Sequence, residues 1–224
     1  MLSEIFKIFW KTVERKDARR INSQTPPTEI EQFCEIQYID DGLWQHRLDV
    51  YSKSGKLSHR PVIIDIHGGG WMYGTKEINK NYCLVLAQND YVVVNINYRL
   101  APDFSVADQL RDCFFAFKWV STNIEKYGGD LNNVFVTGDS AGGFLAAYSA
   151  LLNSSEKLRK IFGVTESGLE FRACGLTSPV CFMNTHTFQD VYYSRVKGKE
   201  FSESTLRGFE NFDAVLDKGS MPPT

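Results

Sequence analysis

The pentapeptide Gly138-Asp139-Ser140-Ala141-Gly142 places one serine between two glycines, in the pattern G-x-S-x-G. This pattern is typical of a serine nucleophile on a sharp, strained turn between a strand and a helix. Side chains two residues before and after the serine would collide in such a turn, so Gly138 and Gly142 are needed there. The helix that follows would point its positive N-terminal end toward developing negative charge. A Gly-Ser turn without chemistry is the alternative, and the flanking apolar strand and small-residue helix argue against it.

A second glycine-rich segment, His67-Gly68-Gly69-Gly70, follows the apolar run at residues 61–66. Three glycines leave backbone N–H groups uncovered, so that they can approach a substrate oxygen to hydrogen-bonding distance. In enzymes with a G-x-S-x-G turn, such a loop supplies oxyanion donors, and the residue after the nucleophile, here Ala141, supplies another. His67 is a candidate base, but it lies within the loop and precedes the serine. We therefore expect its ring to brace the glycines.

Both motifs need buried strands in front of them, and the chain alternates strand and helix patterns. Nearly continuous apolar runs predict strands buried on both faces, and a 3.6-residue period predicts helices between them. A strand pair, 33–40 and 43–51, is predicted around the turn at 40–42. The later predicted strands are 61–66, 91–96, 134–137 and 172–178, and the predicted helices are 76–89, 103–127 and 141–152. This alternation predicts an α/β fold with a mostly parallel sheet and helices on both faces.

Further motifs resemble the hormone-sensitive-lipase-like branch of the α/β-hydrolases. Residues 67–74 read HGGGWMYG, residues 97–102 read NYRLAP, and residues 127–130 read YGGD before LNNVFVTGDSAGG. The resemblance covers about residues 35–180. It implies an α/β-hydrolase fold with a cap, and a carboxylic-ester hydrolase with a Ser-Asp-His triad. One departure is Asp103, where the family usually has Glu.

The resemblance also implies roles for individual residues. Ser140 matches the nucleophile, and a short acyl ester is the expected substrate, with no cofactor and no metal. The closed, apolar pocket expected beside the loop suits small acyl chains. The expected oxyanion donors are Gly69, Gly70 and Ala141, the expected supports of the loop are His67, Gly68 and Asp139, and the expected pocket residues are Trp71 and Met72.

The same comparison of patterns predicts a division of the chain. Residues 1–30 are expected to form an N-terminal cap helix and a connector, and residues 31–179 the α/β-hydrolase core. Residues 180–212 are rich in aromatic and polar side chains and are expected to form a cap insertion. Residues 213–224 are expected to return to the core.

The triad partners of Ser140 are not evident. In this fold they follow the serine in the order acid, then histidine. The only later histidine is His186, preceded by acids at 156, 166 and 170, and too little chain separates them for two full β-α units. We expect His186 to be a cap residue, the last strands to be missing, and residues 1–224 alone to show negligible turnover. The alternative function is therefore a catalytically incomplete or receptor-like ligand-binding protein on the same fold.

Bulk properties exclude several classes of partner. The formal net charge is −2 with no basic cluster, which argues against nucleic acid. No apolar run is long enough to span a bilayer. The amphipathic N-terminal helix is expected to pack on the protein, with a membrane surface as the alternative. Five scattered cysteines indicate reduced thiols and a cytoplasmic location. An open sheet edge would allow a homo-oligomer.

Overall fold

The computed structural model describes residues 2–55, 59–183, 189–203, 206–209, 211–216 and 218–223. Its strands are β1 (Ile30–Gln37), β2 (Arg47–Lys53), β3 (Arg60–Ile66), β4 (Val92–Ile96), β5 (Gly129–Asp139) and β6 (Phe171–Thr177). They form one sheet in the order β1-β2-β4-β3-β5-β6. The strands from β3 to β6 run parallel, whereas β1 and β2 pair antiparallel at one edge. The predicted mostly parallel sheet is confirmed.

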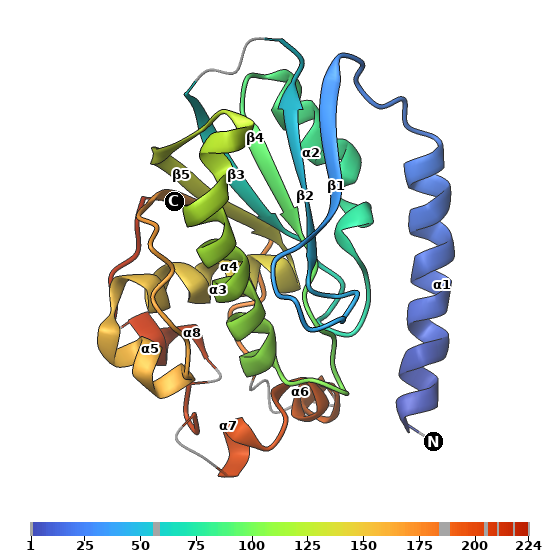
Figure 1. Cartoon of the computed structure of the whole chain (residues 1–224). Helices are drawn as coiled ribbons and strands as arrows, with labels where there is room; N and C mark the ends of the chain where they lie inside the picture. Colours follow the sequence, from blue (N-terminus) through green and yellow to red (C-terminus); the bar gives the residue numbers. More distant parts are fainter. Residues whose placement is uncertain are drawn as a thin grey trace.

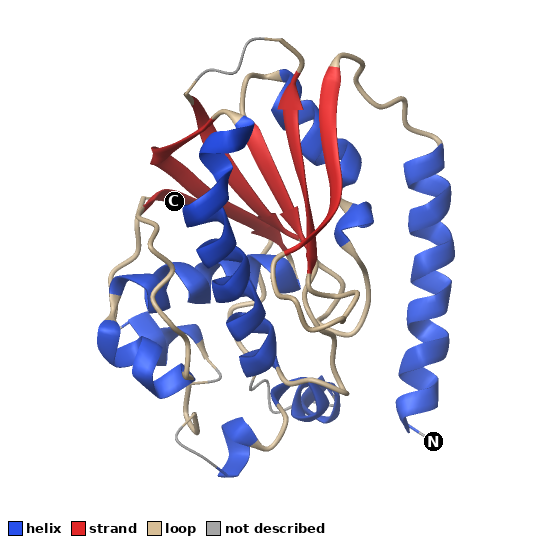
Figure 2. Cartoon of the chain, viewed as in Figure 1, coloured by secondary structure: helices blue, strands red, loops and turns tan. Residues whose placement is uncertain are grey.

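Helices cover both faces of this sheet (Figures 1 and 2). The helices in the first part of the chain are α1 (Leu2–Asn22), α2 (Lys80–Gln88) and α3 (Val106–Asn123), with short 3-10 turns η1 (Lys76–Ile78) and η2 (Ile124–Tyr127). The later helices are α4 (Ala141–Ser154), α5 (Glu156–Phe162), α6 (Gln189–Lys197), α7 (Glu200–Glu203) and α8 (Phe212–Leu216). In Figure 1, α6 and α7 lie beyond the carboxyl ends of the parallel strands.

Alternation along the strands divides the core into two layers. Ile64, Val94 and Val136 are fully buried in the larger cluster, with apolar side chains of α3 and α4. Tyr51 and Val93 point to the other face, where they pack with Cys83, Leu84 and Ala87 of α2. Because side chains alternate across a strand, continuous apolar runs such as 92–94 supply both layers at once.

The predicted tight turn at 40–42 is wrong. Strand β1 ends at Gln37 and β2 begins at Arg47, and residues 38–46 form a loop between them. Asp41 organises this loop, because its carboxylate accepts the N–H of Leu43 at 3.0 Å and lies 2.6 Å from Nδ1 of His46. The other imidazole nitrogen, Nε2, lies 3.2 Å from Oδ1 of the fully buried Asp112. A turn signal was present, but side-chain contacts to distant residues set the loop length.

Other element boundaries also differ from the predicted ones. The helix expected from residue 103 begins at Val106, because Ser105 and Asp108 form a capping box. Strand β5 is longer than the predicted 134–137, and the predicted helix 76–89 is η1 followed by α2. Helix α5 was not predicted.

A buried lysine ties the edge of the sheet to the segment that follows the HGGG loop. The Lys76 side chain is 2% exposed, and its Nζ lies 2.5 Å from Glu35, 3.1 Å from Asp49 and 3.0 Å from Glu77. Its backbone N–H donates to Oδ1 of Asn97 at 2.7 Å. Asp49 is fully buried, so the ammonium offsets a carboxylate that would otherwise be desolvated and unpaired.

We expect Lys76→Met to lower the free energy of unfolding by about 3–5 kcal/mol, because it leaves the buried Asp49 charge unpaired. Lys80→Met is the matched control: Lys80 lies 3.8 Å from the exposed Glu77 carboxylate, so its loss should cost less than about 1 kcal/mol. Urea unfolding of the three proteins measures both values. Equal losses in the two variants would contradict the assignment.

Candidate active site

Ser140 lies at the junction of β5 and α4 in a strained conformation, with φ 51° and ψ −113°. A Cβ on Gly142 would lie 1.9 Å from the carbonyl oxygen of Ile66, and one on Gly138 would lie 2.4 Å from Gly142. Both positions therefore exclude larger residues, as the G-x-S-x-G pattern predicts. The Ser140 N–H donates to the carbonyl of Thr177 at 2.9 Å, which ties the turn to the end of β6.

The HGGG segment forms a tight turn after β3. Gly69 and Gly70 have φ of 117° and 58°, a region that favours glycine. The carbonyl of Gly69 accepts the N–H groups of Met72 and Tyr73, at 3.2 and 3.0 Å. In the described part of the chain, the N–H groups of Gly69, Gly70 and Ala141 have no protein acceptor. These three N–H groups are therefore candidate donors to a ligand.

Asp139 joins the two motifs directly. Its Oδ1 accepts the Gly68 N–H at 2.9 Å and the Nδ2 of Asn79 at 3.0 Å. The same Nδ2 lies 3.0 Å from Oδ2 of Asp65, a buried residue on β3. A Cβ on Gly68 would lie 2.3 Å from Asp139 Oδ2, so the close approach needs glycine. The carboxylate beside the serine therefore holds the glycine loop in place.

His67 is fully buried. Its Nδ1 lies 2.7 Å from the carbonyl oxygen of Gly68, and its ring stacks on Tyr98 at a centroid distance of 4.4 Å. Since a carbonyl only accepts, Nδ1 carries the hydrogen. Burial lowers the pKa of the imidazole to about 4, so the ring is neutral at pH 7. Its described contacts are with the glycine loop and with Tyr98.

The two expected pocket residues, Trp71 and Met72, lie in different surroundings. Trp71 is 1% exposed and packs edge-on against Phe144 and Tyr193, so it presents little surface to a substrate. Met72 is half-buried and lines a cavity of about 400 Å³ whose described wall does not include Ser140. The structure does not bring Trp71 and Met72 together around the serine.

Two residues that the sequence did not single out cover the glycine loop. The Tyr192 hydroxyl on α6 donates to the carbonyl of Gly70, and the Trp10 indole on α1 lies over the same glycine. A Cβ on Gly70 would lie 2.4 Å from the Tyr192 hydroxyl and 2.5 Å from Trp10. No local pattern marks these residues, because they meet Gly70 only through tertiary packing. Asn79, which connects Asp65 and Asp139, was missed for the same reason.

The described residues do not bring a triad histidine to Ser140. His46 lies between Asp41 and Asp112, and His59 is exposed. His67 is fully buried with its Nδ1 on the Gly68 carbonyl, and its Nε2 has no partner among the described residues. His186, the only histidine after Ser140 in the sequence, lies outside the described residues. The acids that follow the serine, at 156, 166 and 170, are exposed.

The fold and the arrangement of the two motifs define an α/β-hydrolase of the hormone-sensitive-lipase-like branch. A family model, BD-FAE, matches residues 48–187, more than half of the chain, and the chain belongs to this family. Among solved structures, esterase B of Lactobacillus rhamnosis, inhibited by a tributyrin phosphonate, aligns with a TM-score of 0.92 and 31% identity. That alignment covers 99% of this chain and 72% of the esterase.

Curated relatives include several esterases and a deacetylase. Versiconal hemiacetal acetate esterase of Dothistroma septosporum is 36% identical over 50% of this chain, and arylacetamide deacetylase of Oryctolagus cuniculus is 46% identical over 55%. Carboxylesterase NlhH of Mycobacterium tuberculosis is 33% identical over 62%. The matches span 33%, 32% and 45% of those proteins, so the chain spans less than half of each relative. In the described part of the chain, no helix is long and apolar enough to cross a membrane.

Asp65 is a titratable residue that contacts the site through Asn79. Burial, with a smaller contribution from the Asp139 charge, raises the pKa of its carboxyl to about 7, although the Asn79 hydrogen bond opposes the shift. The folded protein then holds a proton that an unfolded chain releases near pH 4. This stabilisation is complete below pH 4 and is lost as the pH rises toward 7.

We therefore expect the free energy of unfolding to fall by up to about 1.4 kcal/mol per pH unit between pH 5 and 7 from this group. Asp65→Asn should remove that slope. Asp90→Asn is the control, because Asp90 is exposed and has a φ of 67° that asparagine tolerates. Chemical denaturation at several pH values measures the slopes. Parallel curves for the wild type and Asp65→Asn would show that Asp65 is not the titrating group.

Proposed function

We propose that this protein is a carboxylic-ester hydrolase in which Ser140 is the nucleophile and Gly69, Gly70 and Ala141 supply the oxyanion donors. The observation that carries the proposal is the hydrogen bond from Gly68 N–H to Asp139 Oδ1, because it holds the glycine loop beside the serine turn. Ala141, one of the proposed donors, begins α4 directly after Ser140, so its N–H lies at the N-terminus of that helix. Fixed donors at this point are the main means of stabilising an oxyanion.

In this reaction the Ser140 hydroxyl attacks the acyl carbonyl and gives a tetrahedral oxyanion beside the loop. Collapse of that intermediate releases the alcohol and leaves an acyl group on Ser140, which water then removes. A general base must accept the serine proton. His67 is not assigned as this base, because it is fully buried and burial lowers the pKa of its imidazole to about 4.

A short acyl group is the proposed substrate class. The versiconal relative is described as an acetate esterase, and the esterase B structure carries a tributyrin phosphonate. Around Gly70, the Trp10 indole and the Tyr192 hydroxyl fill the space directly above the loop. Such crowding favours a small acyl chain.

We also propose the division of the chain into a cap of residues 1–30 and 180–212 over a core of residues 31–179, with residues 213–224 returning to the core. The contacts of Trp10 and Tyr192 with Gly70 support it, because both ends of the cap reach the same loop. The return is supported by the Cys174 N–H, which donates to the carbonyl of Pro223 at 2.8 Å beside β6.

Free cysteines at all five positions support a cytoplasmic location.

The test is hydrolysis of a chromogenic acetate by the natural protein that carries this sequence. Replacing Ser140 by alanine removes the nucleophile, so we expect Ser140→Ala to lower kcat by about 10⁴–10⁶-fold. Ser121→Ala is the control, because Ser121 is half-buried on α3 and its hydroxyl donates to its own helix. This variant should keep the wild-type rate.

Equal rates for the wild type and Ser140→Ala would contradict the proposal. If those two proteins also bound the ester with equal affinity, a ligand-binding role on the same fold would replace the enzyme. Circular dichroism of each variant separates loss of the nucleophile from loss of the fold.

A further inference from the structure

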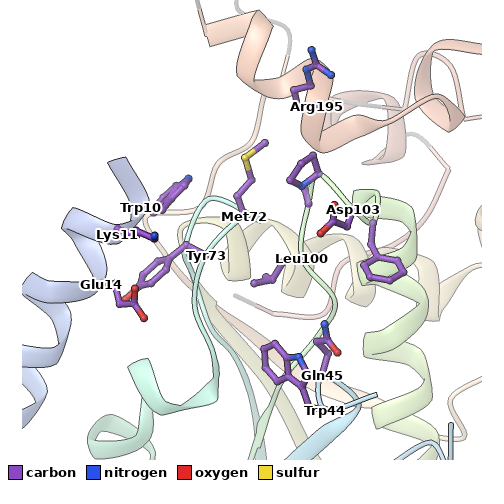
Figure 3. Close-up of a pocket in the computed structure, with 13 residues that line it drawn as sticks. Trp10, Lys11, Glu14, Trp44, Gln45, Met72, Tyr73, Leu100, Asp103 and Arg195 are labelled. Atoms are coloured by element: carbon purple, nitrogen blue, oxygen red, sulfur yellow. The ribbon is translucent and has the colours of Figure 1, made fainter. Parts of the chain in front are cut away.

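The cavity lined by Met72 is distinct from the serine turn and has walls from five segments of the chain (Figure 3). Its volume is about 400 Å³, within the range of small-molecule sites. It lies between α1, the segment after the HGGG loop, the loop at 38–46, the loop before α3, and α6. The lining residues include neither Ser140 nor the proposed oxyanion donors.

Four of the thirteen lining residues are aromatic. Trp10, Trp44, Tyr73 and Phe104 all contribute to the wall, together with Leu100 and other apolar residues. Trp10 stacks on Tyr73, with a centroid distance of 5.3 Å and an interplanar angle of 13°. Trp44 is 50% exposed, so part of its ring is open to a ligand. Aromatic faces of this kind bind planar rings by stacking and edge contacts.

The charges at this cavity balance. Lys11 and Arg195 contribute two cations, and Glu14 and Asp103 contribute two anions. In Figure 3, Lys11 and Glu14 come from α1, whereas Arg195 comes from the helix on the opposite side. A balanced set of this kind gives no net attraction to an ion of either sign. An uncharged ligand therefore suits the cavity better than a carboxylate or an ammonium.

The walls are held in place before any ligand arrives. The Tyr73 hydroxyl donates to Asp17 on α1 at 3.2 Å, and Arg99 lies 4.6 Å from the centroid of the Phe104 ring. The loop that carries Trp44 is tied down by His46, which lies between Asp41 and Asp112. A pocket with fixed walls loses little entropy when it binds.

We propose that this cavity binds a neutral, ring-sized aromatic molecule of the phenol class, at a site separate from Ser140. The ring packs among Trp44, Tyr73 and Phe104, and the Gln45 side chain at the wall offers its hydroxyl a polar partner. A ligand in this cavity would also contact residues that hold the oxyanion loop. Tyr73 and Met72 donate to the Gly69 carbonyl, and Trp10 lies over Gly70.

The experiment is a titration of the protein with 4-fluorophenol, observed by ¹⁹F NMR. We expect saturable binding with a Kd of about 0.1–1 mM. Trp44→Ala should weaken binding at least about five-fold, and Trp44→Phe should largely restore it. Trp119→Phe is the control, because Trp119 packs on Tyr127 away from this cavity. Ser140→Ala should bind as the wild type does.

Each other outcome overturns part or all of the proposal. If 4-fluorophenol did not bind below roughly 10 mM, or bound equally well to Trp44→Ala, the proposed site would be contradicted. Equal affinity for 4-fluorobenzoate would contradict the neutral class. Binding lost in Ser140→Ala would place the ligand at the serine instead. Because no turnover is measured, failure of the esterase proposal leaves this result intact.

Discussion

The Gly68 N–H donates to the Asp139 carboxylate across 71 residues of sequence, and the candidate site depends on this one contact. Gly68 begins the three-glycine turn, whereas Asp139 is the residue before the serine. A hydrogen bond to a carboxylate is stronger than one between neutral groups, and its loss leaves both partners poorly solvated. It therefore fixes the distance between the proposed nucleophile and the proposed donors.

Other features support that contact from two sides. From below, Asn79 bridges Asp139 to the buried Asp65, and Lys76 anchors the same segment to the edge of the sheet. From above, α1 and α6 meet over Gly70 through Trp10 and Tyr192. The glycine loop, which has the conformational freedom to move, is thus held by a polar network beneath it and by aromatic packing over it. Proposed donors held this firmly need no reorganisation when charge develops.

Much of this structure could be predicted from local patterns. The apolar runs at 61–66 and 91–96 and the glycine spacing around Ser140 identified the parallel sheet and the strained turn, because these constraints act within a few residues. The loop at 38–46 could not be predicted, since its length depends on His46 reaching Asp112 in α3. Asn79 and Tyr192 were missed because neither has a local signal, and each acts through a residue far away in sequence.

The most direct test of this account is the rate at which a fluorophosphonate labels Ser140 in the natural protein and in two variants of Asp139. Asp139→Asn keeps an oxygen that accepts the Gly68 N–H, whereas Asp139→Ala removes it. The account predicts labelling of the asparagine variant close to the wild-type rate and of the alanine variant about 10²-fold slower or more, comparable to the loss of an oxyanion donor. Labelling of a folded Asp139→Ala protein at the wild-type rate would show that this carboxylate does not hold the site together.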